Sequence, residues 1–236
     1  MKKGNWVGMV PFYLLIAILC IGAAVTGSTT VTTALQNLSP QRANTIVIDA
    51  GHGGIDGGAT SCTGVLESQI NLEIALKLND LLHLLGYDTV MIRTTDTSVH
   101  TEGNTIAAQK VSDLKERVRI CNETDNAMVV SIHQNTFPDH RYSGAQVFYA
   151  KTEGSRELAS TLQTQLGKAL NPGVNRKSKA SEHIYLMENL RCPGILVECG
   201  FLSNPQEEAL LREKAYQQKL CCVIASALSE FLRSDP

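Results

Sequence analysis

The sequence predicts an α/β domain of three layers, in which helices cover both faces of a largely parallel, twisted sheet. The first observation is that short apolar runs rich in β-branched residues alternate with longer segments of helical period, as they do in βαβ units. The second is that a conspicuous glycine-rich loop follows the first of these runs. The third is a separate apolar stretch near the N-terminus, which predicts one hydrophobic helix ahead of the domain.

The N-terminal stretch predicts an export segment. Lys2 and Lys3 precede an apolar run over residues 6–25, and no further charge occurs before Arg42. A run of this length is about enough to span a bilayer as a helix, and the lysines orient its N-terminus to the cytoplasm. Small residues at the end of the run also suit a signal-peptidase site. Residues 1–27 are expected to be a membrane anchor or a cleaved signal peptide, and either one exports the rest of the chain.

The remaining chain divides into a linker and one domain. Residues 28–44 are rich in Thr, Ser, Gln and Asn and predict a polar linker. Residues 45–234 are enough for a single catalytic domain with a sizeable core. The formal charge of −2 and the isoelectric point near 6.3 argue against a strongly basic surface, so no nucleic-acid partner is expected.

The first half of the domain predicts two strand–helix pairs. "TIVID" is a short buried strand that ends at the glycine-rich loop. Residues 67–85 carry apolar side chains every three or four positions, which predicts a helix that stops at Gly86. "YDTVMIR" is the next strand. A polar loop then leads to a helix around "SDLKERVRICNET", with Ser112 as its expected N-cap.

The second half continues the alternation. "AMVVSIH" and "GAQVFYA" are expected strands, and "SRELASTLQTQLGKAL" is an amphipathic helix. "GILVECGF" predicts a last buried strand. A single C-terminal helix is then expected from near Pro205 towards Phe231.

Cysteine usage does not require a disulfide framework. Six cysteines lie outside the N-terminal segment, but they form no CxxC pair, and a domain of this size needs no covalent staples. Several of them fall in apolar patterns, where cysteine behaves as a small hydrophobic residue. We therefore expect mostly free and buried thiols.

Four chemically competent side chains are expected to converge at the carboxyl ends of the strands, where ligands of open α/β sheets bind. His52 follows the first strand, His133 ends the third, and Glu198 falls near the end of the last. Glu67 opens the first helix. Two imidazoles and a carboxylate are a ligand set for Zn²⁺ that leaves a position open for water. The second carboxylate would take the proton from that water, so the set indicates metal-assisted hydrolysis.

The loop "IVIDAGHGGIDGGA" supports this interpretation. Its five glycines clear side chains from a stretch of backbone around His52, which lets the backbone approach a metal ion and a bulky substrate. The spacing matches neither the P-loop nor the dinucleotide-binding fingerprint, and no Lys-Ser or Lys-Thr pair follows.

These motifs resemble the zinc-dependent N-acetylmuramoyl-L-alanine amidases of the amidase-3 type. The resemblance runs from about residue 45 to 232 and rests on "IDAGHGGIDGGA", "ESQINLEIA", "MIRTTD", "RVRICNETDNAMVVSIHQN", "SGAQVFY" and "ILVECGFLSNPQEEALL". It implies that His52, Glu67 and His133 bind one zinc ion per chain and that Glu198 is the catalytic glutamate. Gln134 and Cys199 stand where other residues are commoner in the family; neither is an expected ligand.

The insertion "AAQKVSDLKERV" and the segments "SGAQVFYA" and "HIYLMEN" resemble the spore-cortex branch of the family, which acts in muramic-δ-lactam formation. The resemblance implies a peptidoglycan substrate, a role in cortex maturation and germination, and an exported enzyme on the cortex side of a forespore membrane. An accessory protein and a homodimer are possible partners.

The implied reaction is hydrolysis of the amide bond between the lactyl group of N-acetylmuramic acid and L-alanine. A zinc carboxypeptidase or deacetylase acting on the same polymer, and a non-catalytic wall-binding protein, are the alternatives. Asn135, beside His133, either orients the loop or contacts the substrate. Arg93 and Asp96 either form an ion pair that fixes their loop, the role we favour, or contact the substrate. Arg117 is expected to pair within the protein.

Overall fold

The computed structural model describes residues 45–234. The hydrophobic segment expected over residues 1–27 and the linker expected over 28–44 lie outside the described residues. Within 45–234, no helix combines the length and the apolar character needed to cross a membrane.

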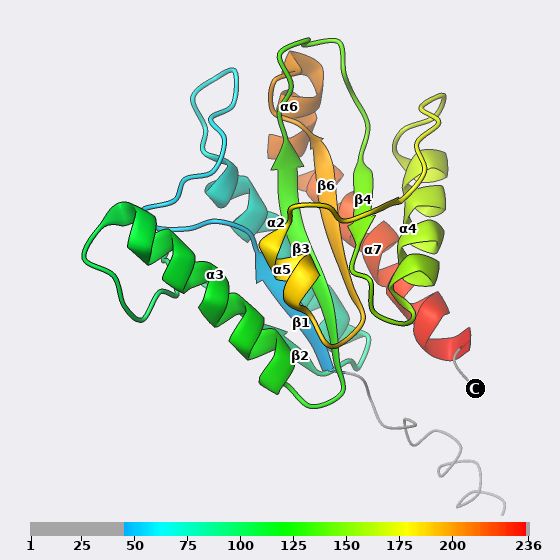
Figure 1. Cartoon of the computed structure of the whole chain (residues 1–236). Helices are drawn as coiled ribbons and strands as arrows, with labels where there is room; N and C mark the ends of the chain where they lie inside the picture. The colour runs from blue at the N-terminus through cyan, green and yellow to red at the C-terminus, as the bar shows by residue number, and fades with distance from the viewer. Residues whose placement is uncertain (1–44, 235–236) are drawn as a thin grey trace, which may run out of the picture. The chain divides into compact units, whose positions relative to one another are not determined.

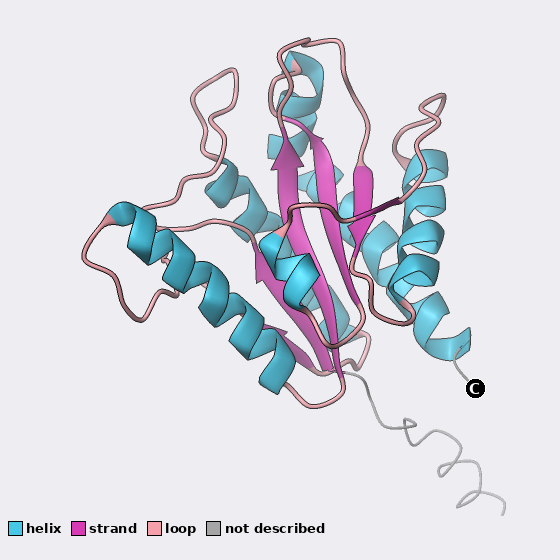
Figure 2. Cartoon of the chain, viewed as in Figure 1, coloured by secondary structure: helices cyan, strands magenta, loops and turns pink. Residues whose placement is uncertain are grey.

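The described domain is built on one six-stranded sheet (Figures 1 and 2). In spatial order its strands are β2 (Thr89–Met91), β1 (Thr45–Ala50), β3 (Ala127–Asn135), β6 (Gly194–Phe201), β4 (Gln146–Tyr149) and β5 (Lys179–Ala180). The first four are mutually parallel, whereas β4 runs antiparallel to β6 and β5 follows the direction of β4. The prediction of a largely parallel sheet is confirmed.

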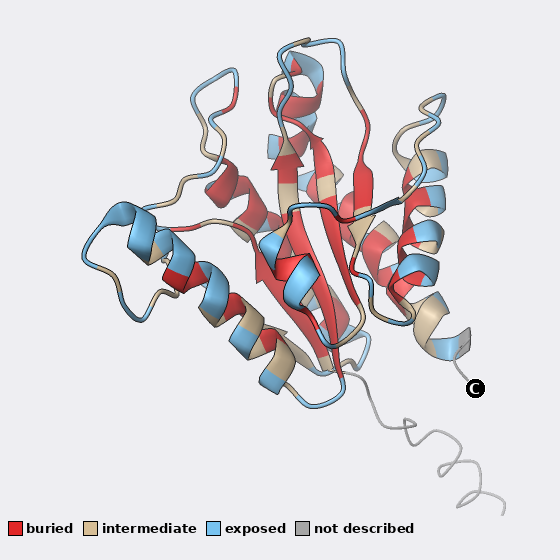
Figure 3. Cartoon of the chain, in the orientation of Figure 1, coloured by how far each residue is buried: buried red, intermediate tan, exposed pale blue. Residues whose placement is uncertain are grey.

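Helices cover both faces of this sheet, as predicted. On one face lie α2 (Glu67–Leu84), α4 (Ser155–Ala169) and α7 (Lys214–Ser234), and on the other lie α3 (Ile106–Glu123) and α5 (Tyr185–Asn189). The strands alternate their side chains between the two layers: Ile46 and Ile48 join the core under α2, whereas Val47 joins the core under α3. Figure 3 shows the buried sheet between partly exposed helices.

Helix α3 begins earlier than the sequence predicts. Its N-cap is Thr105, whose side chain accepts a hydrogen bond from the backbone N–H of Ala108. The prediction of Ser112 as the cap is wrong, because Ser112 lies inside the helix. Its hydroxyl accepts instead from the backbone N–H groups of Thr101 and Glu102, at 3.1 and 3.2 Å, and so ties the preceding loop to the helix.

The single helix expected at the C-terminus is also wrong. The structure has α6 (Pro205–Arg212) and α7, separated at Glu213, whose φ of −79° and ψ of 125° are extended. Asn204 caps α6 by accepting from the N–H groups of Gln206 and Glu207. The short elements β5 and α5 had no periodic signal, because two to five residues do not complete a pattern.

All six cysteines of the described domain are free thiols, as expected. Cys121, Cys199 and Cys221 are buried, but Cys62 and Cys222 are exposed, so the expected burial holds for only part of the set.

Candidate metal centre and active-site cleft

The four expected residues meet at the carboxyl edge of the parallel strands. His52 follows β1 directly, and His133 lies on β3 in register with Glu198 on the neighbouring strand β6. Glu67 is the first residue of α2. Because the strands are parallel, their carboxyl ends meet at one edge, and side chains from distant parts of the chain come together there.

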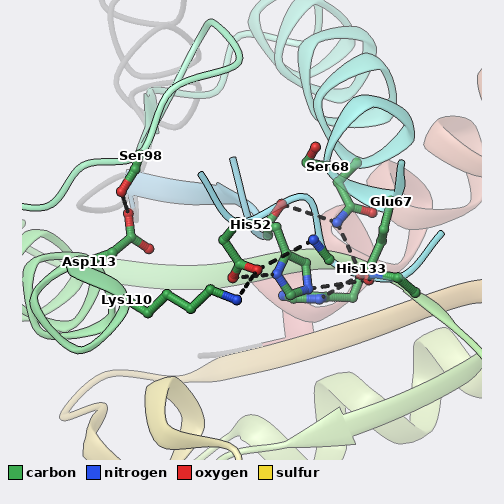
Figure 4. Close-up of polar contacts among 12 residues, drawn as sticks. His52, Glu67, Ser68, Ser98, Lys110, Asp113 and His133 are labelled. Atoms are coloured by element: carbon green, nitrogen blue, oxygen red, sulfur yellow. Dashed lines mark hydrogen bonds and ion pairs between the residues drawn. The ribbon is translucent and has the colours of Figure 1, made fainter. Parts of the chain in front are cut away.

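His52, Glu67 and His133 form a group that could hold a metal ion. One potential ligand atom from each residue lies within 4.8 Å of the others. The carboxylate of Glu67 lies between the two imidazoles: Oε2 is 3.2 Å from Nε2 of His52, and Oε1 is 3.0 Å from Nδ1 of His133 (Figure 4). Glu67 is buried, whereas about a fifth to a quarter of each imidazole remains exposed, at 20% and 25%.

Backbone and side-chain donors hold the Glu67 carboxylate. The N–H groups of Ala59 and Gln134 donate to its two oxygens at 2.9 and 3.0 Å, and the side-chain amide of Asn71 donates at 3.2 Å. Burial opposes ionisation, but His133 and His52 outweigh it, so the pKa of Glu67 lies far below its usual range. Gln134 also donates from its side chain to Asn71, which explains how this unusual residue is accommodated beside the site.

Two glycines of the loop make room for these side chains. A Cβ at Gly51 would lie 2.1 Å from Nε2 of His133, and a Cβ at Gly58 would lie 2.6 Å from Oε2 of Glu67. His52 itself has a φ of 62°, a left-handed conformation that non-glycine residues adopt rarely and that often occurs at functional sites. These two glycines are therefore required to make room for the side chains of His133 and Glu67.

Two buried arginines fix the backbone of the glycine-rich loop. Arg93 donates to the carbonyls of Ala50 and Gly51, and Arg117 donates to those of Ala50 and His52. Arg117 also forms an ion pair with Asp49 at 2.5 Å. Burial raises the pKa of Asp49, but the charge of Arg117 outweighs it and holds that pKa below its usual range. The internal pairing expected of Arg117 is confirmed. Arg93 has a structural role, but through backbone carbonyls and not through an ion pair with Asp96, which accepts from the N–H of Gly54.

Asp56 and Lys110 complete the surroundings of His52, and sequence reasoning missed both. Asp56 Oδ2 lies 2.8 Å from Nδ1 of His52, and its other oxygen accepts from the Lys110 ammonium at 2.8 Å (Figure 4). A carboxylate can only accept here, so Nδ1 carries the proton and Nε2 faces Glu67. Burial lowers the pKa of His52, but Glu67 and Asp56 outweigh it and raise that pKa to about 9, so this site favours positive charge.

Glu198 faces an open cleft beside these residues. The cleft has a volume of about 360 Å³, and its walls include His52, His133, Glu198, Lys110 and Tyr185. Oε2 of Glu198 is buried and has no hydrogen-bond partner in the described part of the chain. Burial raises the pKa of Glu198 to about 7, which suits a group that exchanges protons near neutral pH.

Of the two further polar residues near the site, His183 lines the cleft and Asn135 does not. Asn135 ends β3 and accepts a hydrogen bond from Leu202 through its backbone carbonyl, but it is not among the residues that line the cleft. His183, without a predicted role, does line the cleft and has a left-handed φ of 64°. It belongs to the irregular loop before α5.

The fold and this edge of the sheet agree with a known family. The family model described as N-acetylmuramoyl-L-alanine amidase, of the amidase-3 type, matches residues 46–230. The chain belongs to this family. The fold and the enzyme class predicted from the sequence are thereby confirmed.

Similar proteins support the assignment. The germination-specific N-acetylmuramoyl-L-alanine amidase of Bacillus subtilis is 37% identical over 201 residues, which cover 84% of this chain and 84% of that protein. The structure of the CwlD amidase from Clostridioides difficile in complex with the GerS lipoprotein superposes with a TM-score of 0.78 at 38% identity, covering 81% of this chain and 100% of that one. An N-acetylmuramoyl-L-alanine amidase from Clostridium difficile 630 gives a TM-score of 0.72 at 31% identity, covering 83% of this chain and 100% of that one.

Proposed function

We propose that this chain hydrolyses the amide bond between the lactyl group of N-acetylmuramic acid and L-alanine in peptidoglycan, using one zinc ion. The observation that carries the proposal is the convergence of His52, Glu67 and His133 beside Glu198 in an open cleft. Family membership supplies the amide bond as the target.

The three side chains fit zinc. Two imidazole nitrogens and one carboxylate oxygen are typical ligands of catalytic zinc, and a site with three protein ligands leaves one position free. The carboxylates of Glu67 and Asp56, which lie on either side of the His52 ring, give the site a negative charge that favours a bound cation. The hydrogen bond from Nδ1 of His52 to Asp56 is the outer contact that metal-binding histidines generally make.

The chain's own residues account for the proton movements. When bound, zinc would supply Lewis acidity, polarising the scissile carbonyl and making water acidic enough to ionise near neutral pH. Glu198 accepts a proton from the attacking water and returns it to the amine of L-alanine as the bond breaks. Glu198 lies opposite His133 on the adjacent strand, which supports a position beside the amide bond to be cleaved.

We also propose a role in the spore cortex, on the outer side of a membrane. The relative from Bacillus subtilis is named as germination-specific, and the CwlD amidase was solved with the GerS lipoprotein, which supports an accessory protein for this chain too. The apolar run at 6–25 supports export, as a membrane anchor or signal peptide, and residues 28–44 would then link it to the catalytic domain. A homodimer stays a prediction.

Product analysis tests the proposed reaction. The purified chain is incubated with peptidoglycan, with and without added zinc, and the products are identified by mass spectrometry. We expect new amino-terminal L-alanine and peptide-free glycan, both lost on addition of a chelator. Cuts elsewhere in the stem peptide would identify a carboxypeptidase, and loss of acetyl groups would identify a deacetylase; either result would overturn the proposal.

A further inference from the structure

A pair of exposed aromatic rings lies beyond the metal centre, in the loop between β3 and β4. Phe137 is 44% exposed and Tyr142 is 46% exposed, and their ring centroids are 4.4 Å apart. This loop stands at the same end of the molecule as α6 (Figure 1). We call Phe137 and Tyr142 the aromatic pair. Two rings exposed side by side offer a ligand an extended apolar contact.

The aromatic pair is held rigidly by the corner between β6 and α6. The backbone N–H of Phe137 donates to the hydroxyl of Ser203 at 3.0 Å, and Asn204 donates from its side chain to the carbonyl of Tyr142 at 3.2 Å. The buried ring of Phe201 lies 6.2 Å from that of Tyr142. Because these contacts fix the loop, binding at the pair costs little conformational entropy.

A pocket of about 420 Å³ lies beside Phe137 of the aromatic pair. Its lining residues, apart from Ser203, belong to the segments that follow Ala59 and His133. It is lined by uncharged or aromatic side chains and one imidazole: Thr60, Cys62, Thr136, Phe137, Pro138, His140 and Ser203. Thr60 follows Ala59, which donates to Glu67, and Thr136 comes three residues after His133. The pocket is therefore close in sequence to two residues of the candidate metal centre, Glu67 through its donor Ala59 and His133.

We propose that the aromatic pair and this pocket bind a sugar ring of the glycan strand, next to the muramoyl residue whose amide is cleaved. The inference rests on the proposed function. A pyranose ring has an apolar C–H face that packs on an aromatic ring and an edge of hydroxyl groups that hydrogen-bond. Thr60, Thr136 and Ser203 offer hydroxyl groups beside the aromatic pair, so the surface has both kinds of partner.

The charge of the pocket favours a sugar over the stem peptide. Stem peptides carry free carboxylates, which would need a cationic partner. No Lys or Arg lines this pocket in the described chain. Arg141 is paired with Asp139 at 2.7 Å, and Arg176 donates to the carbonyl of Ser143.

The kinetic test compares a polymer with a fragment. The full chain and the double variant Phe137→Ala/Tyr142→Ala are assayed on intact peptidoglycan strands and on a muramoyl dipeptide that has no neighbouring sugar. We expect the double variant to raise KM on the polymer about tenfold more than on the fragment, with little change in kcat. Phe137→Tyr and Tyr142→Phe, which keep the rings, should restore the polymer KM.

The matched control is the double variant Leu84→Ala/Leu85→Ala, which removes exposed apolar side chains at the end of α2. Leu84 is 83% exposed and Leu85 is 52% exposed. The control should cleave both substrates like the unaltered chain. If the aromatic double variant changes both KM values equally, or neither, the sugar site is wrong.

A binding measurement separates this inference from the proposed function. Peptide-free glycan strands are titrated into the Glu198→Gln variant with and without the aromatic double substitution, and affinity is measured by calorimetry. We expect the aromatic substitution to weaken binding about tenfold. Equal affinities, or binding of free stem peptide in place of glycan, would overturn the sugar site whether or not the unaltered chain is an amidase. Failure to release L-alanine termini from any substrate would instead overturn the proposed function.

Discussion

Glu198 combines two properties that seldom occur together in a side chain without a function. Its Oε2 is buried without a hydrogen-bond partner, yet the residue lines an open cleft. Burying a carboxylate without a hydrogen-bond partner lowers the stability of the native state, and such destabilising groups occur mainly at functional sites. In the proposed mechanism this residue is the base, and its pKa of about 7 suits proton exchange near neutral pH.

The variant Glu198→Gln tests this role. We expect turnover to fall by roughly 10²–10⁴-fold, because Gln cannot accept the proton. Zinc content should stay at one per chain, since the three proposed ligands are intact. Glu157→Gln, on the exposed face of α4, serves as the control and should keep full activity. Loss of zinc from the Glu198 variant would show that this residue is a ligand, contrary to the proposal.

Asp56 acts on the site through His52. It accepts from Nδ1 of the ring and is itself held by Lys110. We expect Asp56→Asn to weaken zinc binding by roughly 10–100-fold, because outer contacts of this kind fix the tautomer and orientation of a ligand. Lys110→Met should have a smaller effect in the same direction. Competition with a chromophoric chelator measures both.

The control for this pair is Asp139→Asn, which breaks an exposed contact with Arg141 outside the site. It should bind zinc as the unaltered chain does. If the Asp56→Asn variant also binds zinc normally, the contact with His52 stabilises the glycine-rich loop and does not contribute to zinc affinity.

Among the individual residues of the site, those at the ends of strands and at the start of a helix could be predicted from the sequence. His52, His133 and Glu198 follow from strand ends, and Glu67 follows from a helix start. Lys110 could not be predicted as a partner of Asp56, because 54 positions separate them and nothing in either local pattern marks the contact. The contact between Phe137 and Tyr142 could not be predicted either, because both residues lie in a loop without a periodic pattern.

At the scale of whole elements, α3 is joined to the sheet through buried charge. Arg117 on α3 pairs with Asp49 on β1 and with Asp113 one turn earlier, and it also donates to the glycine-rich loop. The same side chain therefore fixes the helix, the first strand and the loop that carries His52. Breaking a buried pair leaves an uncompensated charge, which costs more than the pair contributes.

We expect Arg117→Met to lower the free energy of unfolding at pH 7 by about 3–5 kcal/mol. The native pKa of Asp49 lies below its ordinary value of 3.8, so its stabilising contribution is present above that value and is lost as the pH falls through the lowered pKa. Without Arg117, burial, which raises the pKa of Asp49, is opposed only by the hydrogen bond from Ser131 and the charge of His133, so that pKa rises relative to the unaltered chain. The difference between variant and unaltered chain should therefore be larger at pH 7 than at pH 4.

Urea unfolding at the two pH values measures this difference. Arg119→Met, which breaks exposed contacts with Glu116 and Glu123 on the same helix, is the control and should leave the free energy of unfolding nearly unchanged. An equal loss at both pH values would contradict a role for the Asp49 charge.

The long elements of the fold could be predicted and the short ones could not. Helices α2 and α4 begin and end within a residue of the predicted bounds, because each has several turns of apolar period. The break at Glu213 was missed because the apolar positions of α6 and α7 continue one pattern across it. Likewise α5, whose first residue Tyr185 lines the cleft, is too short to show a period.

At the scale of the whole domain, the candidate metal centre joins three separate segments of the chain at this edge of the sheet. The proposed ligands come from the loop after β1, the start of α2 and the end of β3. The cores on the two faces of the sheet stabilise the strands themselves, but this edge is crossed mainly by polar contacts around Glu67. A bound ion would therefore add stability to the native state that the unfolded chain lacks.

Removing the metal should lower the melting temperature of the domain. An ion present at a thousand times its Kd stabilises the native state by about 4 kcal/mol. For a domain of this size, each kcal/mol shifts Tm by about 2–4 °C, so a chelator should lower Tm by roughly 8–16 °C and added zinc should restore it. Calorimetry of the His133→Ala variant is the control, because a chain without this ligand should melt at the same temperature with and without chelator. A chelator effect of equal size in both proteins would mean that the stabilising ion binds elsewhere.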